Sequence, residues 1–135
     1  MGILIFSVGC QRPSQQVTIV AVDYAFRVPS TIAPGPTTII FDNQGRVAHE
    51  FSIARLKPGL AVDSLRAAFR SGMDLGAVID GPIGILFAAP GQPSPGRLQV
   101  DFAAGRTYAI ICQFRDASDK PPHVDLGMVG SIRIE

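Results

Sequence analysis

The stretch "RLQVDFAAGRTYAIICQF", residues 97–114, decides the fold of this 135-residue chain. Its first half alternates apolar Leu98, Val100 and Phe102 with polar residues, which is the period of a β-strand buried on one face. An Ala-Gly turn follows, and a second run contains threonine, tyrosine and two isoleucines, which favour strands. The stretch therefore predicts two strands joined by a short turn.

The same strand signal recurs on both sides of this stretch. Upstream it appears in "QVTIVAVDYAFRVPSTIAPG" (16–35), "PTTIIFDNQG" (36–45) and "HEFSIARL" (49–56), and downstream in "MVGSIRIE" (128–135). A further strand is expected near 83–88. The 14 glycines and 11 prolines are spread without a period, as in a protein with many turns.

One segment has a different rhythm. In "GLAVDSLRAAFRSG" (59–72), Val62, Leu65 and Phe69 fall at the spacing of one helical face, and Gly72 stands where a helix C-cap is expected. We therefore predict an all-β fold, a Greek-key antiparallel β-sandwich of seven or eight strands, with one inserted short helix near residues 60–71.

Composition narrows the class of protein. Apolar residues make up 47% of the chain and charged residues 17%, which is enough apolar material for a packed core. The net charge of +1 argues against a nucleic-acid-binding surface. We expect a monomer with one domain over residues 17–135 and no nucleic-acid partner.

Residues 1–16, "MGILIFSVGCQRPSQQ", are interpreted as a leader and spacer. The apolar run is too short to span a bilayer as a helix, and Ser7-Val8-Gly9-Cys10 resembles the lipobox of bacterial lipoproteins. This predicts an extracytoplasmic protein, in the bacterial periplasm or anchored to a membrane through lipid on Cys10. Cys112 would then have no disulfide partner, so its thiol needs another role.

Three of four rare side chains share the core side of the predicted strands. His49 has the parity of Phe51 and Ile53, Cys112 that of Tyr108 and Ile110, and Met128 that of Ile132 and Ile134, whereas His123 lies in a loop between two strands. One thiolate, two imidazoles and a thioether suit copper, and two histidines, one cysteine and a weak axial methionine form a blue-copper site. The alternative is that each of these four side chains is an ordinary structural residue with no metal to bind.

The chain resembles the cupredoxin family, the group of plastocyanin and azurin. The resemblance rests on "NQGRVAHEF" (43–51), "PGQPSPGRLQVDFAAGRTYAIIC" (90–112) and "HVDLGMVGSIRIE" (123–135). It implies one copper ion (Cu⁺/Cu²⁺) held by His49, Cys112, His123 and Met128. Ten residues separate Cys112 from His123, more than is usual in this family, and Glu50 stands where plastocyanins often carry asparagine. The parity of Glu50 argues against a ligand role for its carboxylate.

The resemblance implies a small exported type 1 (blue) copper protein that carries electrons between redox partner proteins and is not an enzyme. Pro121, Pro122, Val124 and Leu126 are expected to form an apolar docking rim near His123. Two alternatives stay open: a copper carrier, store or oxidase-assembly protein that passes the metal to a copper-accepting protein, and a metal-free module with the same fold. A multicopper oxidase would need more than the two histidines present.

Overall fold

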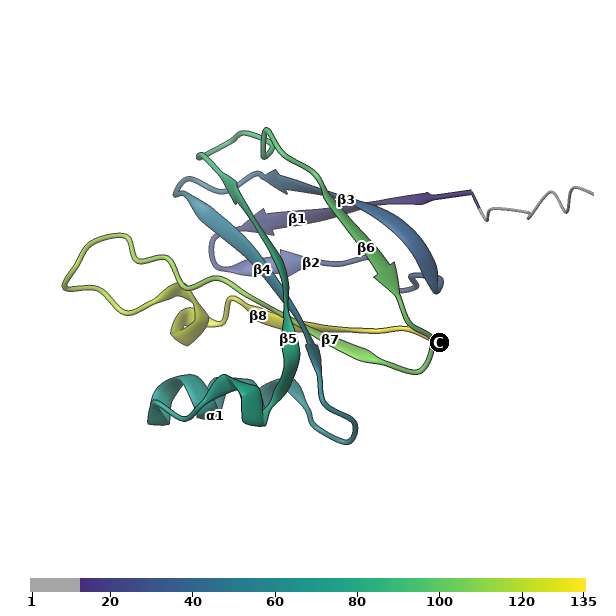
Figure 1. Cartoon of the computed structure of the whole chain (residues 1–135). Coiled ribbons are helices and arrows are strands. Elements are labelled where there is room, and N and C mark those ends of the chain that lie inside the picture. Colours follow the sequence, from purple (N-terminus) through teal and green to yellow (C-terminus); the bar gives the residue numbers. More distant parts are fainter. Residues whose placement is uncertain (1–12) are drawn as a thin grey trace, which may run out of the picture.

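Two four-stranded sheets pack face to face in the computed structural model, which describes residues 13–135 (Figure 1). The first sheet has the order β2-β1-β3-β6 and the second the order β5-β4-β7-β8. The strands are β1 (Gln15–Val22), β2 (Ala25–Arg27), β3 (Gly35–Asn43), β4 (His49–Leu56), β5 (Ile79–Ala88), β6 (Leu98–Phe102), β7 (Thr107–Ile111) and β8 (Val129–Arg133). The prediction of an all-β sandwich with one inserted helix is confirmed.

The two strands of the opening stretch separate into different sheets. β6 pairs with β3, with Val100 opposite Thr37, whereas β7 lies between β4 and β8. Apolar side chains from both sheets meet in one core, in which Phe41, Phe51 and Phe102 are at most 2% exposed. The alternation that predicted the strands therefore marks the faces that close the sandwich.

Three details differ from the sequence-based expectations. β1 and β3 pair in parallel, whereas an antiparallel sandwich was expected. β5 begins at Ile79 rather than near residue 83; Gly81 and Pro82 obscure its pattern, and it tolerates them because it is an edge strand paired to β4 through register shifts. β1 starts at Gln15, two residues inside the segment interpreted as leader and spacer. Most of that segment lies outside the described residues, and the leader stays a prediction.

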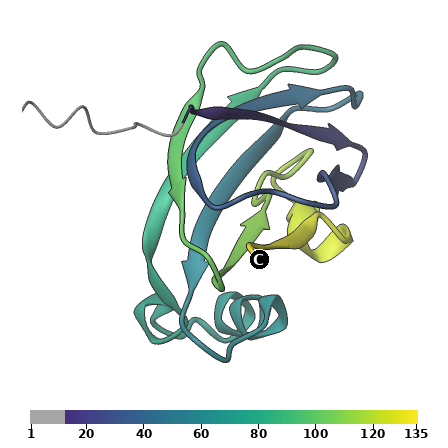
Figure 2. The ribbon, with the colours of Figure 1, turned by 90° about the vertical axis from the view of Figure 1, so that its right-hand side faces the viewer.

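Helix α1 (Val62–Ser71) lies outside the sandwich, against the outer face of the second sheet (Figures 1 and 2). Leu65 and Ala68 are its buried residues, and they pack in a second apolar cluster with Ala109 and Ile111 of β7. The helix ends at Gly72, which adopts the left-handed conformation (φ 66°) and donates its N–H to the carbonyl oxygen of Ala68, as expected for a C-cap.

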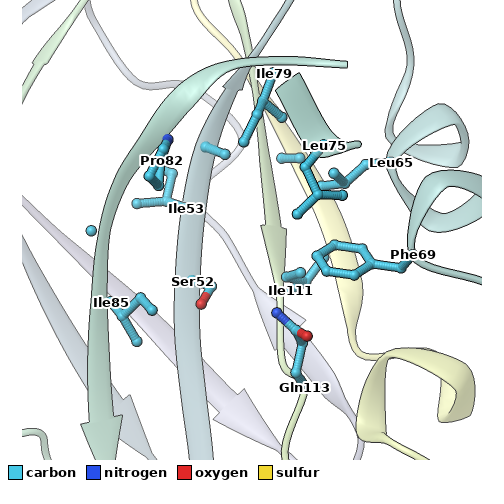
Figure 3. A pocket seen from close by; sticks show the side chains of 13 residues that line it. Ser52, Ile53, Leu65, Phe69, Leu75, Ile79, Pro82, Ile85, Ile111 and Gln113 are labelled. Atoms are coloured by element: carbon cyan, nitrogen blue, oxygen red, sulfur yellow. The ribbon is translucent and has the colours of Figure 1, made fainter. Parts of the chain in front are cut away.

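An apolar groove separates the helix from β5 on this outer face (Figure 3). Phe69 and Leu75 line one side, Pro82 and Ile85 the other, and Ser52 and Gln113 add polar atoms. None of the four predicted ligands lines it. Within residues 13–135, no helix has the length and apolar character needed to cross a bilayer.

Candidate metal centre

The four predicted ligands lie at one end of the second sheet, where three neighbouring strands begin or end. His49 is the first residue of β4, Cys112 directly follows β7, and Met128 directly precedes β8. His123 opens the 3-10 helix η2 (His123–Leu126). His49, Cys112 and Met128 are 0% exposed and His123 is 1% exposed, so all four belong to the interior.

Three donor atoms converge in this interior. The Nδ1 atoms of His49 and His123 are 3.1 Å apart, and the Sγ atom of Cys112 lies 3.9 Å from the first and 3.4 Å from the second. The ligand atoms of these three side chains all lie within 4.8 Å of one another, and among the described residues no other group of three histidine, cysteine or acidic side chains does so. Two backbone hydrogen bonds tie Met128 to these residues: its N–H donates to the carbonyl oxygen of His123 (2.9 Å), and its carbonyl oxygen accepts the N–H of Cys112 (3.1 Å).

The ten-residue loop between Cys112 and His123 folds back on itself. The N–H of His123 donates to the carbonyl oxygen of Phe114 at 2.8 Å, which closes the base of the loop. Nearer the tip, the N–H of Lys120 donates to the oxygen of Ala117, and the guanidinium of Arg115 donates to the oxygen of Lys120. The extra length therefore does not separate the imidazole of His123 from the Cys112 sulfur.

Each imidazole is held by a carboxylate on the side away from the donor cluster. The Nε2 atom of His49 lies 3.1 Å from Oδ1 of Asp23, and the Nε2 atom of His123 lies 2.8 Å from Oδ1 of Asp116. A carboxylate only accepts, so each neutral imidazole carries its proton on Nε2 and a free lone pair on Nδ1. This assigns the tautomer of both rings from their partners.

Two lone pairs therefore face each other across 3.1 Å, beside the sulfur of Cys112. Two acceptors at this distance repel unless a proton or a cation lies between them. A thiolate and two imidazole lone pairs are the donors that a soft or borderline transition metal prefers. The residues present fit a copper ion by the chemistry of their donor set.

Burial lowers the pKa of His49, so its imidazole is neutral at pH 7, although the hydrogen bond to Asp23 acts in the opposite direction. Burial also raises the pKa of the Cys112 thiol to about 11, against the smaller opposing effect of the backbone N–H groups of Glu50 and Phe114. Cys112 is therefore a thiol in the metal-free protein, and a metal must displace its proton.

Glu50 supports the site without contributing a ligand. Its backbone N–H donates to Sγ of Cys112 at 3.3 Å, and its carboxylate accepts the N–H of Gln113 at 2.8 Å. It thus ties the start of β4 to Cys112 and to the residue that follows it, and its carboxylate is not in the donor cluster. Glu50 therefore steadies the start of the loop that follows Cys112.

The turn before His49 is equally constrained. The side-chain nitrogen of the buried Asn43 lies within hydrogen-bond distance of the oxygens of Val47 (2.8 Å), Ala88 and Ala89, and its oxygen accepts the N–H of Gly45. A Cβ atom on Gly45 would collide with Asp23 and stand 3.0 Å from Nε2 of His49. Gly45 therefore leaves the space in which carboxylate and imidazole meet.

Sequence reasoning missed several supporting residues. Asp23, Asp116 and Asn43 were not singled out, and neither was the hydroxyl of Tyr24, which donates to Asp116; the ring of Tyr24 lies 4.8 Å from that of His123. No local pattern marks these partners, because they meet only in the folded chain. One expected docking residue is corrected: Val124 is 6% exposed because it packs in the cluster beneath helix α1.

Comparison with known proteins identifies the fold. No family model and no curated protein matches the chain. Solved structures do match. The reduced auracyanin of Roseiflexus castenholzii is 19% identical (TM-score 0.59, covering 90% of this chain and 97% of that one). Auracyanin A of Chloroflexus aurantiacus, described as a blue copper protein, is 20% identical (TM-score 0.58, covering 91% of this chain and 100% of that one). Rusticyanin of Thiobacillus ferrooxidans is 24% identical (TM-score 0.56, covering 93% of this chain and 79% of that one).

Proposed function

We propose that this protein, which has the cupredoxin fold of those blue copper proteins, binds one copper ion and carries electrons between redox partner proteins. His49, Cys112, His123 and Met128 would hold the ion, with one thiolate, two imidazoles and one thioether as the donors. The observation that carries the proposal is the convergence of one sulfur and two imidazole nitrogens within 4.8 Å in a buried site.

The surroundings of this site favour electron transfer. When bound, copper would supply a one-electron couple, and the chain would keep the same ligand geometry in both oxidation states. His49, Cys112 and Met128 are anchored at strand ends, and His123 is held through Phe114 and Asp116. Ligands on rigid elements with fixed hydrogen-bond partners hold their positions when the charge of the metal changes.

The alternative function, delivery of copper to an accepting protein, would be favoured by a mobile ligand loop that lets the metal leave. The internal hydrogen bonds of the loop and the burial of every proposed ligand support the electron carrier instead. An oxidase with a trinuclear copper cluster has no support, because the chain contains two histidines and both are in this site. We therefore propose a binding protein that is not an enzyme.

Repeated oxidation and reduction in the presence of a strong Cu(I) chelator tests the electron carrier. The copper-loaded protein is expected to exchange one electron per chain in each cycle and to retain its copper. The proposed ligands are buried, and the two histidines are fixed by hydrogen bonds to Asp23 and Asp116. Transfer of the copper to the chelator within the time of one reduction would instead indicate a copper-delivery protein. Failure to bind copper at all would indicate a metal-free module.

Copper affinity is expected to depend on pH through the Cys112 thiol. Its pKa of about 11 means that binding releases one proton at neutral pH, whereas His49, whose pKa is lowered, releases none. The apparent affinity should therefore rise about tenfold per pH unit between roughly pH 7 and 10, and fall more steeply below the lowered pKa of His49, where that imidazole must also lose a proton. Competition titrations against a chelator of known pH dependence measure this slope. A flat profile would contradict the involvement of a protonated thiol.

The proposed location is extracytoplasmic, as the pattern of residues 1–16 suggests, with a lipid on Cys10 as the proposed anchor. Cys112 is a free buried cysteine, which is consistent with a thiol kept for a metal. Mass spectrometry of the protein isolated from native membranes tests the anchor: an acylated N-terminal cysteine supports it, and an intact chain without an acyl group counts against it.

A further inference from the structure

The two carboxylates behind the imidazoles are not equivalent. Asp23 receives the backbone N–H of Arg46 at 3.0 Å and its guanidinium at 3.2 Å, so a cation lies against its negative charge. Asp116 receives the hydroxyl of Tyr24, which is a neutral donor, and His123. Within residues 13–135, no lysine or arginine nitrogen lies within 4.0 Å of the Asp116 carboxylate, whose partner at that distance is the imidazole of His123.

The position of Asp116 brings its charge close to the donor cluster. Its Oδ1 atom lies 2.8 Å from Nε2 of His123, and the Nδ1 atom of the same ring faces the sulfur of Cys112 at 3.4 Å. The imidazole is 1% exposed, whereas the side chain of Asp116 is 32% exposed. Water therefore screens the carboxylate only in part, and no solvent layer separates it from the ring.

A carboxylate on the far nitrogen of a ligating histidine increases the electron density that the ring donates to a metal. Its negative charge also favours the oxidation state with the higher positive charge. Both effects act in the same direction, toward Cu(II) and away from Cu(I). At Asp23 the backbone N–H and the guanidinium of Arg46 offset part of the charge, although the Arg46 side chain is 93% exposed and itself screened. The lower exposure of Asp23, 13% against 32% for Asp116, acts in the opposite direction.

We propose that Asp116 is a positioning residue that lowers the midpoint potential of the copper site, and that Asp23, whose charge is partly offset by Arg46, lowers it less. The inference rests on the proposed copper-binding function and deepens it. It also gives the long loop between Cys112 and His123 a specific role, because this loop carries Asp116, the hydrogen-bond partner of His123.

The substitution D116N tests this assignment, because asparagine removes the charge and keeps an oxygen that can accept the Nε2–H of His123. Its amide NH2 then faces the Tyr24 hydroxyl, which can turn to accept instead of donating. Mutation of an outer partner of a metal ligand typically costs 10–100-fold in metal affinity. Taking the lower value for the difference between Cu(II) and Cu(I), D116N should shift the equilibrium toward Cu(I) about tenfold, a rise of about 59 mV for one electron. The matched control D23N should give a smaller rise. Potentiometric titration of the blue absorption measures both.

A potential that D116N leaves unchanged or lowers would overturn the inference, as would an equal or larger rise in D23N. The copper-free wild-type protein gives a second readout. Nitrogen-15 NMR should show both histidines protonated on Nε2, and a His123 protonated on Nδ1 would overturn the inference without any copper present. A wild type that never forms a blue site would refute the proposed function as well, whereas a blue wild type with an insensitive D116N potential would refute this inference alone.

Discussion

Substitution of Cys112 by serine is expected to abolish the intense blue absorption of the copper-loaded protein. The colour of a blue copper site depends on its thiolate, and serine offers a hydroxyl that stays protonated and binds copper poorly. Copper affinity should fall by more than the roughly 10–100-fold that loss of an outer hydrogen-bond partner costs. Absorption spectroscopy after addition of Cu(II) measures the colour, and competition titration measures the affinity.

The matched control is C10S in the full chain, since Cys10 is the only other cysteine in the sequence. It should leave the colour and the affinity unchanged. C112S itself should fold, because a serine oxygen at this buried position can accept the N–H of Glu50 that now points at the sulfur. Circular dichroism of the copper-free variant checks this. A C112S protein that folds and remains blue would remove Cys112 from the site.

Truncation of Phe51 to alanine is expected to lower the free energy of unfolding by about 3–5 kcal/mol, the usual range for a fully buried phenylalanine. Phe51 is 0% exposed, and its ring lies 5.7 Å from that of Phe41 and 6.2 Å from that of Phe26, so alanine leaves a cavity between the two sheets. Denaturant unfolding of the copper-free protein measures the loss. Because β4 also carries His49, the variant should bind copper more weakly as well.

Phe87 is the matched control, because it stands on the neighbouring strand β5, opposite Glu50, and is 53% exposed. It stacks on Phe114 with the ring centroids 5.6 Å apart, so F87A should lose about 0.5–1.5 kcal/mol from the aromatic pair and only part of the burial energy of a phenylalanine, and so clearly less than F51A. Equal losses in F51A and F87A would mean that the interior between the sheets does not dominate the stability of the domain.

Alternation along the strands was sufficient to predict the sandwich and the inward direction of His49 and Cys112. Parity works there because residues two apart in a strand share a face, whatever the partner strand is. The helix was predicted over 60–71 and found at Val62–Ser71, since its apolar spacing and Gly72 are local signals. Features of this kind need no knowledge of the tertiary fold.

The supporting contacts could not be predicted in this way. The partner of His49 is Asp23, 26 residues earlier in the chain, and the partner of His123 is Asp116, on a loop without strand or helix periodicity. The parallel pairing of β1 and β3 likewise depends on where the intervening chain crosses, which a strand pattern does not record. The tertiary fold determines these contacts, so the spacing of residues along the sequence does not predict them.

Titration of the purified copper-free protein with Cu(II), followed by absorption, tests the copper site most directly. A blue copper centre built by His49, Cys112, His123 and Met128 predicts an intense blue band that grows to saturation at one copper per chain and disappears on reduction. A protein that stays colourless when excess Cu(II) is present, or a band that does not saturate at one equivalent, would contradict it.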